Sequence, residues 1–251
     1  MKAKNSLSLL VAAVAMLALG APVLASDTDD RIEASAKDSY VFKTYLNNDD
    51  IEIESEAGAV TLTGMVAEDS HKTLAGETLA SLPGVKSVDN KLKVKGDLPV
   101  EKSDAWLLTK VKTSLLYHRS VSGLQTEVVV QDGIVTLRGE ADNEAQKNLT
   151  AEYVADIEGV KTVNNEMTVA KTAKETRTAG DIIDDASITA MAKMTLLYHR
   201  STSGFQTKVE TKDGVVLLSG KAGSLAEKDL ATQYVKDVNG VKDVKNLMTI
   251  E

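Results

Sequence analysis

The sequence contains no cysteine, and its 251 residues include only three prolines, two phenylalanines and one tryptophan. Without thiols, the chain can form neither disulfide bonds nor thiolate metal sites, and it cannot use a cysteine nucleophile. Because 43% of the chain is hydrophobic, the scarcity of aromatic residues predicts small cores filled by aliphatic side chains. The three histidines, His71, His118 and His199, lie too far apart in sequence for the usual zinc spacings. We expect no metal and no cofactor.

Acidic residues outnumber basic ones and give the chain a formal net charge of −8 at pH 7. Nucleic acid and anionic membrane attract basic proteins, so an acidic chain binds either one poorly unless it carries a local basic or aromatic patch. We therefore expect no nucleic-acid partner. The glycines form no phosphate-binding loop, and no nucleophile motif accompanies the serines and histidines. The sequence is not that of an enzyme.

The first 25 residues have the pattern of a secretory signal peptide. Lys2 and Lys4 give a basic start, an apolar run extends from Leu7 to Leu19, and the residues before Ser26 predict cleavage after Ala25. The apolar run is shorter than the ~20 residues of a membrane-spanning helix. We expect a soluble periplasmic protein whose first residues, 26–30, are loosely ordered.

One β-hairpin motif occurs three times. Its clearest copy is Asp132-Gly133 followed by alternating apolar residues and Gly139, and the turn returns as Asp213-Gly214 and, more weakly, as Ala57-Gly58. The surrounding segments align without gaps, and about half of the positions are identical between the second and the third. These segments are residues 31–94, 106–169 and 187–250. The chain is therefore a threefold internal repeat.

Each repeat has the pattern helix, strand, strand, helix, strand. The elements predicted for repeat two are a helix capped by Ser103 or Asp104, a strand at 126–131, a second strand that ends at Gly139, a helix capped by Asp142 or Asn143 that closes at Gly159, and a last strand up to Val169. This pattern predicts an α+β fold of three tandem αββαβ domains. In each domain, a three-stranded mixed sheet is covered on one face by two helices.

The predicted domains are residues 26–94, 104–169 and 185–251, joined by linkers at 95–103 and 170–184, the second of which reads as a flexible or partly helical tether. Units of ~60 residues are marginally stable alone, so the repeats are expected to pack against one another. The outer sheet faces of repeats two and three carry apolar residues that would suit packing between these repeats or against a partner. They are Val129, Ile134, Val215 and Leu217.

The repeated motif resembles the BON domain family. In repeat two it reads Gly133-x-Val135-x-Leu137-x-Gly139, and after a helix Gly159-Val160-x-x-Val163-x-Asn165-x-Met167-x-Val169. The resemblance implies an αββαβ fold, a periplasmic or envelope setting and non-enzymatic work, with phospholipid or another envelope surface as the partner. Periplasmic stress proteins of the family usually carry two copies, so the third copy here is a departure.

The segment Leu115 to Ser120 recurs without change as Leu196 to Ser201 at the end of the first helix. One interpretation is a patch that binds an anion such as a lipid phosphate, because arginine offers a planar fork of donors and histidine gains charge as pH falls. The alternative is structural, with the tyrosines packing and the basic side chains stabilised at a helix C-terminus. The candidate residues are Tyr117, His118, Arg119, Tyr198, His199 and Arg200.

Trp106, at the start of the first helix of repeat two, lies one helical turn before Lys110. Tryptophan beside lysine is typical of contacts at a membrane interface, and a Trp that packs between repeats is the alternative. Two functions remain open. The first is a module that binds phospholipid or envelope surfaces and supports envelope integrity under osmotic stress. The second is a soluble chaperone-like holdase for unfolded periplasmic client proteins.

Overall fold

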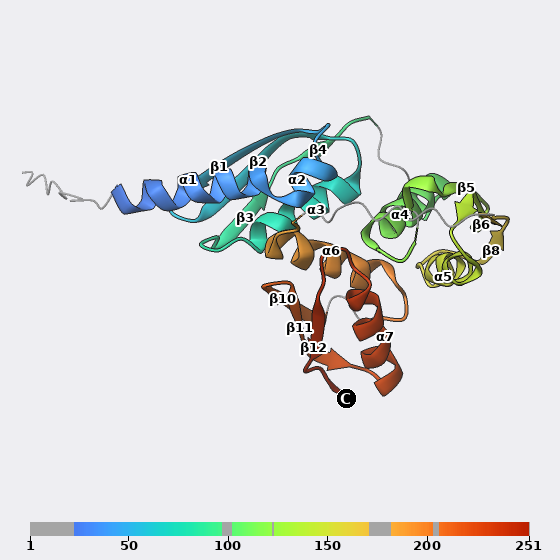
Figure 1. Ribbon diagram of the computed structural model, residues 1–251. Coiled ribbons are helices and arrows are strands. Elements are labelled where there is room, and N and C mark those ends of the chain that lie inside the picture. The colour runs from blue at the N-terminus through green and yellow to red at the C-terminus, as the bar shows by residue number, and fades with distance from the viewer. Residues whose placement is uncertain (1–22, 97–101, 122, 171–181, 203–205, 251) are drawn as a thin grey trace, which may run out of the picture.

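The computed structural model describes residues 23–96, 102–121, 123–170, 182–202 and 206–250 (Figure 1). Repeat one comprises α1 (Val23–Asp38), α2 (Tyr40–Thr44), β1 (Asp50–Glu56), β2 (Ala59–Val66), α3 (Asp69–Ala80), β3 (Ser87–Asn90) and β4 (Lys93–Val94). Repeat two comprises α4 (Asp104–Tyr117), a 3-10 turn at Gly123–Gln125, β5 (Glu127–Gln131), β6 (Ile134–Arg138), β7 (Glu140–Ala141), α5 (Glu144–Ala155), β8 (Thr162–Asn165) and β9 (Thr168–Val169). Repeat three comprises α6 (Asp185–Tyr198), β10 (Thr207–Lys212), β11 (Val215–Ala222), α7 (Leu225–Lys236), β12 (Asp243–Asn246) and β13 (Thr249–Ile250).

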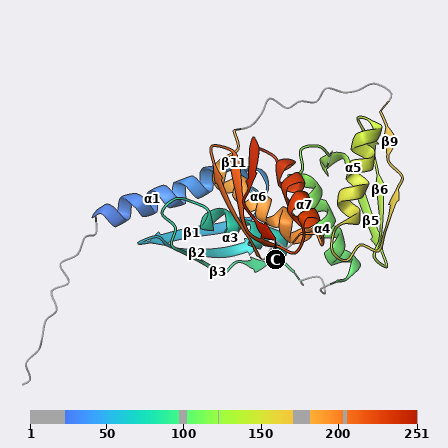
Figure 2. The same ribbon diagram turned by 90° about the horizontal axis from the view of Figure 1, so that it is seen from below.

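The predicted α+β fold is confirmed in all three repeats. In each one, an antiparallel hairpin is followed by a helix and by a strand that returns parallel to the second hairpin strand. The resulting strand orders are β1-β2-β3, β5-β6-β8 and β10-β11-β12. Short additional strands continue the parallel pairing, with β4 on β2, β9 on β7 and β13 on β11. The sheets are therefore mixed, and the helices pack against them (Figures 1 and 2).

The hairpin turns have positive φ at both central residues, as two-residue turns of this kind require. A carboxylate from the first helix accepts hydrogen bonds from the turn. Asp104 binds the backbone N–H groups of Asp132 and Gly133 at 2.6 and 2.9 Å, while Ser103 caps the helix. Asp185 in repeat three and Asp29 in repeat one bind their own turns in the same way. One acidic side chain thus fixes the first helix to the hairpin in each repeat.

The expectation that residues 26–30 are loosely ordered was wrong. They belong to α1, and Asp29 is 7% exposed where it binds the turn at Ala57 and Gly58. In repeat one the first helical segment is interrupted at Ser39, which caps the short helix α2 by accepting a hydrogen bond from Phe42. Of the predicted signal peptide, residues 1–22 lie outside the described residues. So do residues 171–181, most of the linker predicted at 170–184.

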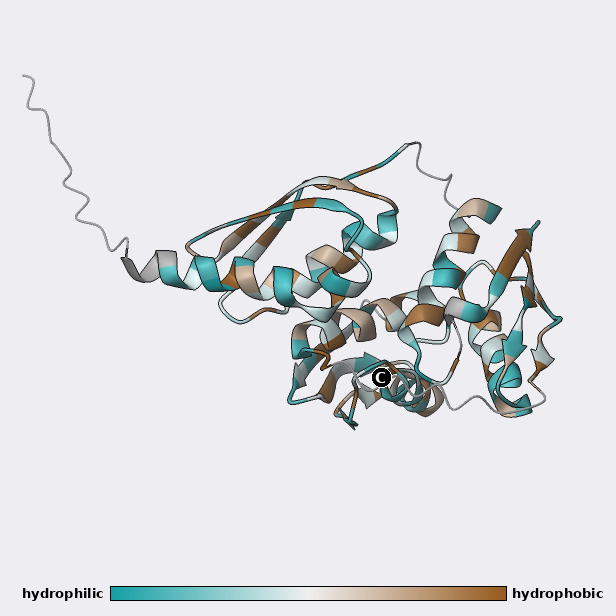
Figure 3. Cartoon of the chain, turned by 45° about the horizontal axis from the view of Figure 1, so that its top comes forward, coloured by the Kyte–Doolittle hydropathy of each residue, from teal (hydrophilic) through white to brown (hydrophobic). Residues whose placement is uncertain are grey.

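Helix α6 lies at the centre of the assembly (Figures 1 and 2). All of its residues are buried except Asp185, Lys193 and Leu197, which are half-buried. It packs on its own strand β10, on α3 of repeat one and on α4 of repeat two. A helix buried on all sides needs small or apolar residues around its whole circumference, and α6 has them as alanine, methionine, isoleucine and leucine. By contrast, α1 consists mainly of hydrophilic residues, shown in teal in Figure 3.

Repeats one and three share one continuous apolar core, whereas repeat two has a core of its own that also takes in Tyr234 from repeat three. Polar contacts reinforce the junction of repeats one and three. Tyr40 N–H donates to Asp184 at 2.8 Å, Val41 N–H donates to the Ser187 hydroxyl at 3.0 Å, and Lys193 pairs with Glu77 at 2.7 Å. Val129 and Ile134 do not pack at the junction of repeats two and three, since they remain 42% and 41% exposed; packing against a partner, the alternative for this face, stays a prediction.

Met191→Ala tests the shared core. Met191 is fully buried in α6 within the core common to repeats one and three, so the substitution should lower the free energy of unfolding by about 2–5 kcal/mol. The measurement is urea unfolding followed by circular dichroism. The control Leu247→Ala removes a side chain that is 65% exposed and should change stability by less than about 0.5 kcal/mol. Equal losses in the two variants would contradict the shared core.

Candidate functional site

The repeated segment at the end of α4 reaches across to the end of α7 in repeat three. His118 Nδ1 lies 3.4 Å from Asp237 Oδ2, and the hydroxyl groups of Ser120 and Tyr153 donate to the same carboxylate. Backbone contacts accompany these side chains, because His118 pairs with Val238 as an isolated antiparallel bridge and Arg119 N–H donates to the Asp237 carbonyl at 2.9 Å. The carboxylate of one repeat is therefore held mainly by donors of the other.

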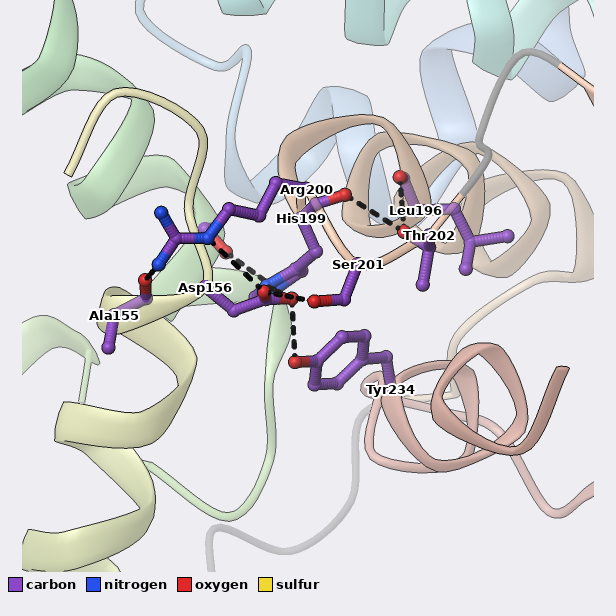
Figure 4. A network of polar contacts seen from close by, with 9 residues as sticks. Ala155, Asp156, Leu196, His199, Arg200, Ser201, Thr202 and Tyr234 are labelled. Atoms are coloured by element: carbon purple, nitrogen blue, oxygen red, sulfur yellow. Dashed lines mark hydrogen bonds and ion pairs between the residues drawn. The ribbon is translucent and has the colours of Figure 1, made fainter. Parts of the chain in front are cut away.

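The same arrangement occurs a second time with the two repeats exchanged. His199 at the end of α6 lies 3.5 Å from Asp156 at the end of α5. Ser201 and Tyr234 donate to this carboxylate as well, and the Arg200 guanidinium lies beside it (Figure 4). Each residue of this set lies 81 positions from its counterpart: the histidine, arginine, serine and tyrosine lie 81 positions after theirs, and Asp156 lies 81 positions before Asp237. Repeats two and three therefore meet through one self-complementary patch, like an isologous dimer interface within one chain.

The two halves of this interface touch at its centre. The rings of His118 and Tyr153 are 4.1 Å apart, those of His199 and Tyr234 are 4.2 Å apart, and the two imidazoles are 5.7 Å apart. Both histidines are almost completely buried. Repeat one has Lys43, Ser81 and Thr78 at the positions of His118, Asp156 and Tyr153, so it cannot form this patch.

Burial and hydrogen bonding set the pKa values in this interface. Burial is the largest influence on Asp156 and acts to raise its pKa, but His199, Ser201 and Tyr234 together outweigh it and lower that pKa to about 2. The pKa of Asp237 is lowered by His118, Ser120 and Tyr153 in the same way, again against burial. Burial lowers the pKa of His199. The interface therefore holds anionic carboxylates and favours a neutral His199.

The guanidinium groups close the interface from outside. Arg119 donates to the carbonyl oxygens of Val241 and Lys236, and Arg200 donates to those of Val160 and Ala155. These are the last carbonyls of α7 and α5 and those of the following loops, where a cation is stabilised by the helix dipole. The side chains of both arginines remain about half exposed, at 45% and 52%. The prediction that they contact a lipid phosphate stays a prediction.

The other predicted site residues gather elsewhere. Trp106, Lys110 and Tyr198 line one pocket of about 240 Å³, in which residues of all three repeats take part. The Lys110 ammonium lies 4.7 Å from the centre of the Trp106 ring and 5.5 Å from that of Tyr198. It also pairs with Glu158 at 3.1 Å. Tyr117, in contrast, is buried and packs against Tyr45 of repeat one, at 5.6 Å between ring centres.

The remaining walls of the pocket come from α3 and α6. Helix α3 contributes Asp69, Ser70 and Thr73, and α6 contributes Met194 and Leu197 beside Tyr198. The lining thus combines two aromatic rings, aliphatic surface, hydroxyl groups and charges of both signs, which is the composition of small-molecule sites. Among the described residues, no group of three or more histidine, aspartate or glutamate side chains could hold a metal ion.

The sequence did not single out Asp237, Glu158, Asp69, Tyr153 or Tyr234 as site residues. A signal for the interface was present, because tyrosine, aspartate, histidine and arginine occur together in repeats two and three and are absent together from repeat one. No comparable signal marks the pocket, whose residues come from three distant segments.

Comparison with known proteins assigns the repeats to a family. The BON domain model matches residues 28–96, 103–171 and 184–251. The chain belongs to the BON domain family. Three BON domains therefore account for most of the chain, and each match contains one αββαβ unit of the structure.

Relatives with curated descriptions include the osmotically inducible protein Y of Escherichia coli K12, which is 32% identical over 188 residues, or 75% of this chain and 91% of the relative. The outer membrane lipoprotein DolP of Haemophilus influenzae is 31% identical over 42% of this chain and 55% of its own length. A solved structure of CdsD, a structural protein of the type III secretion system of Chlamydia trachomatis, aligns over 88% of this chain and 92% of its own, at 16% identity. Its TM-score of 0.25 is too low to support an argument.

Asp156→Asn tests the interface of the two BON repeats. The substitution removes the charge that His199, Arg200, Ser201 and Tyr234 surround, so it should lower the free energy of unfolding by about 2–4 kcal/mol. Chemical unfolding measures the loss. The control Glu166→Gln breaks the exposed ion pair with Arg138 and should cost less than about 1 kcal/mol. A loss no larger than that of the control would show that the interface is not held by its carboxylates.

Stability should fall as the solution is acidified, in two steps. The folded-state pKa of His199 lies below its unfolded value near 6.5, so the unfolded chain binds more protons and stability decreases as pH falls below about 6.5. The pKa of Asp156, about 2 in the folded state against 3.8, adds a further decrease between about pH 4 and pH 2.

Unfolding curves from about pH 8 to pH 2 measure this dependence. His199→Gln should remove part of the decrease near pH 6. If His199→Gln has the same pH profile as the unsubstituted chain, His199 is not the group responsible.

Proposed function

We propose that this protein is a non-enzymatic, envelope-associated BON protein of the periplasm that binds phospholipid at the pocket between its three repeats. The main observation in support of this proposal is that Trp106, Lys110 and Tyr198 line one pocket. Trp106 is half-buried, and the Lys110 ammonium lies 4.7 Å from the centre of its ring. An aromatic ring beside a lysine at a surface opening suits the interfacial region of a membrane, where rings lie among headgroups and ammonium groups meet phosphates.

The relatives support an envelope setting, since one is named an outer membrane lipoprotein and another is named for osmotic induction. As part of the proposal we extend to this chain the envelope setting and a role in envelope integrity under osmotic stress, with secretion by the predicted signal peptide. None of the helices in the described ranges is long and apolar enough to cross a membrane. Attachment through a pocket and its rim, at the surface of the lipid layer, needs no such helix.

A holdase function is the second candidate, and the outer face of the repeat-two sheet favours it. Val129 and Ile134 expose about 40% of their surface there, on the strands β5 and β6. Exposed aliphatic side chains on a sheet can bind apolar segments of an unfolded chain. This function needs no lipid, so an aggregation assay with several unfolded clients separates it from the first.

Trp106 is the chain's only tryptophan, so its fluorescence reports on the pocket without labelling. Phospholipid vesicles should shift its emission to shorter wavelength, and lipids with brominated acyl chains should quench it. Lys110→Met should weaken vesicle co-sedimentation about fivefold, because it removes the ammonium group and keeps most of the apolar stem. The matched control Lys112→Met, on the exposed side of the same helix, should weaken it by less than about twofold. Vesicles that neither pellet the protein nor change its fluorescence would refute the lipid proposal.

A further inference from the structure

The junction pocket contains charges of both signs on different elements. Lys110 on α4 is 7% exposed and contacts Glu158, whose side chain is 63% exposed. Asp69 stands at the start of α3 and is exposed. No ion pair or hydrogen bond of its carboxylate occurs among the described residues. The pocket therefore has one ammonium group that already has a partner and one carboxylate that has none.

The Tyr198 hydroxyl adds an unused donor to the same pocket. Tyr198 is 9% exposed and lines the pocket, and within the described part of the chain its hydroxyl has no hydrogen-bond partner. A hydroxyl that lines a pocket and has no protein partner can donate to a ligand. Burial first, and then the negative charges of Asp69 and Glu68, raise the pKa of Tyr198 well above its usual value. The group therefore stays neutral and can donate to an anionic oxygen.

The balance of charges disfavours a purely anionic ligand. Two carboxylates, Asp69 and Glu158, line the pocket against the single ammonium group of Lys110. An anion would have to compete with Glu158 for Lys110 and would be repelled by Asp69. A simple cation would be attracted by Asp69 but would leave the Tyr198 donor unused. A ligand with an anionic and a cationic group satisfies both ends.

The size and the apolar walls limit the ligand further. A volume of about 240 Å³ lies below the range of sites for drug-sized ligands, about 300–1,000 Å³, so the pocket suits a headgroup rather than a whole lipid. Met194, Leu197 and the Trp106 ring supply aliphatic and aromatic surface for the carbon atoms that link the two charges.

We propose that the junction pocket binds a zwitterionic phosphoamine headgroup of the phosphoethanolamine type, with its ammonium group at Asp69 and its phosphate at Tyr198 and Lys110. This inference rests on the proposed lipid-binding function and specifies its ligand. A primary ammonium donates hydrogen bonds to Asp69, which a quaternary ammonium cannot do. The pocket should therefore prefer phosphoethanolamine to phosphocholine as well as to glycerophosphate.

The test uses the full chain and the fluorescence of Trp106. Titrations with soluble phosphoethanolamine, phosphocholine, glycerophosphate and ethanolamine at constant ionic strength measure the affinity for each headgroup compound. Titrations with vesicles of phosphatidylcholine alone, or mixed with phosphatidylethanolamine or phosphatidylglycerol, measure the affinity for the lipid. Phosphoethanolamine should bind at least about fivefold tighter than each of the other three compounds, as expected for one added ion pair at a pocket rim. Vesicles with phosphatidylethanolamine should bind best.

Asp69→Asn should reverse this preference. It should weaken the binding of phosphoethanolamine about fivefold, because it removes the attraction for the ammonium group, and it should strengthen the binding of glycerophosphate, because it removes the repulsion of the phosphate. A variant that misfolds would lose both. The control Asp89→Asn removes a carboxylate of β3 whose partner is Lys91, and it should change neither affinity.

The outcomes separate the two proposals. If vesicles bind but glycerophosphate binds as tightly as phosphoethanolamine, or Asp69→Asn leaves the preference unchanged, the headgroup inference is wrong and lipid binding stands. If soluble phosphoethanolamine binds with the expected preference and no vesicle binds, the headgroup chemistry stands, its source is a free phosphoamine, and the lipid proposal falls. If nothing binds, both are refuted.

Discussion

The crossed carboxylates Asp156 and Asp237 are the constraint on which the assembly of this protein depends. Each ends the second helix of one repeat and receives donors from the other repeat. A carboxylate taken from water into a largely buried site is costly unless it is paired and hydrogen-bonded. Only the arrangement with repeats two and three in register supplies a histidine, a serine and a tyrosine to both carboxylates at once. The polar groups thereby select one relative orientation out of many that would bury similar apolar area.

Repeat one can join the pair formed by repeats two and three only in another way. Repeat one lacks the tyrosine, histidine and aspartate of the patch, so it packs against the free side of α6 through α3 and shares an apolar core with repeat three. This position explains why two helices of common origin differ so much in composition. Helix α4 has Lys110 where it lines the pocket, whereas the corresponding residue of the more enclosed helix α6 is Met191.

The fold of each repeat could be predicted from the sequence because its determinants are local. Turn residues with positive φ, caps and the alternation of apolar residues act within a few positions, and the same signals recur in each repeat. Contacts between repeats depend on complementarity of side chains about 80 residues apart, which periodicity does not encode. Periodicity therefore did not show that Tyr117 and His118 are buried between repeats. It also did not show that Asp104 binds the backbone of a hairpin turn instead of capping its helix. Trp106, Lys110 and Tyr198 were predicted as site residues from the sequence, but Asp69 and Glu158, which give their pocket its charge pattern, were not.

The pocket exists only because the three repeats meet, and this links its ligand to the assembly. Its lining combines Asp69 from repeat one, Trp106 and Lys110 from repeat two, and Tyr198 from repeat three. Separation of any repeat would divide these groups, so a ligand that needs them together binds the assembled form and stabilises it by mass action. The proposed headgroup would thus hold repeat one against the pair formed by repeats two and three. Conversely, the buried carboxylates that orient repeats two and three also place Lys110 beside Tyr198, so the same interface shapes the pocket.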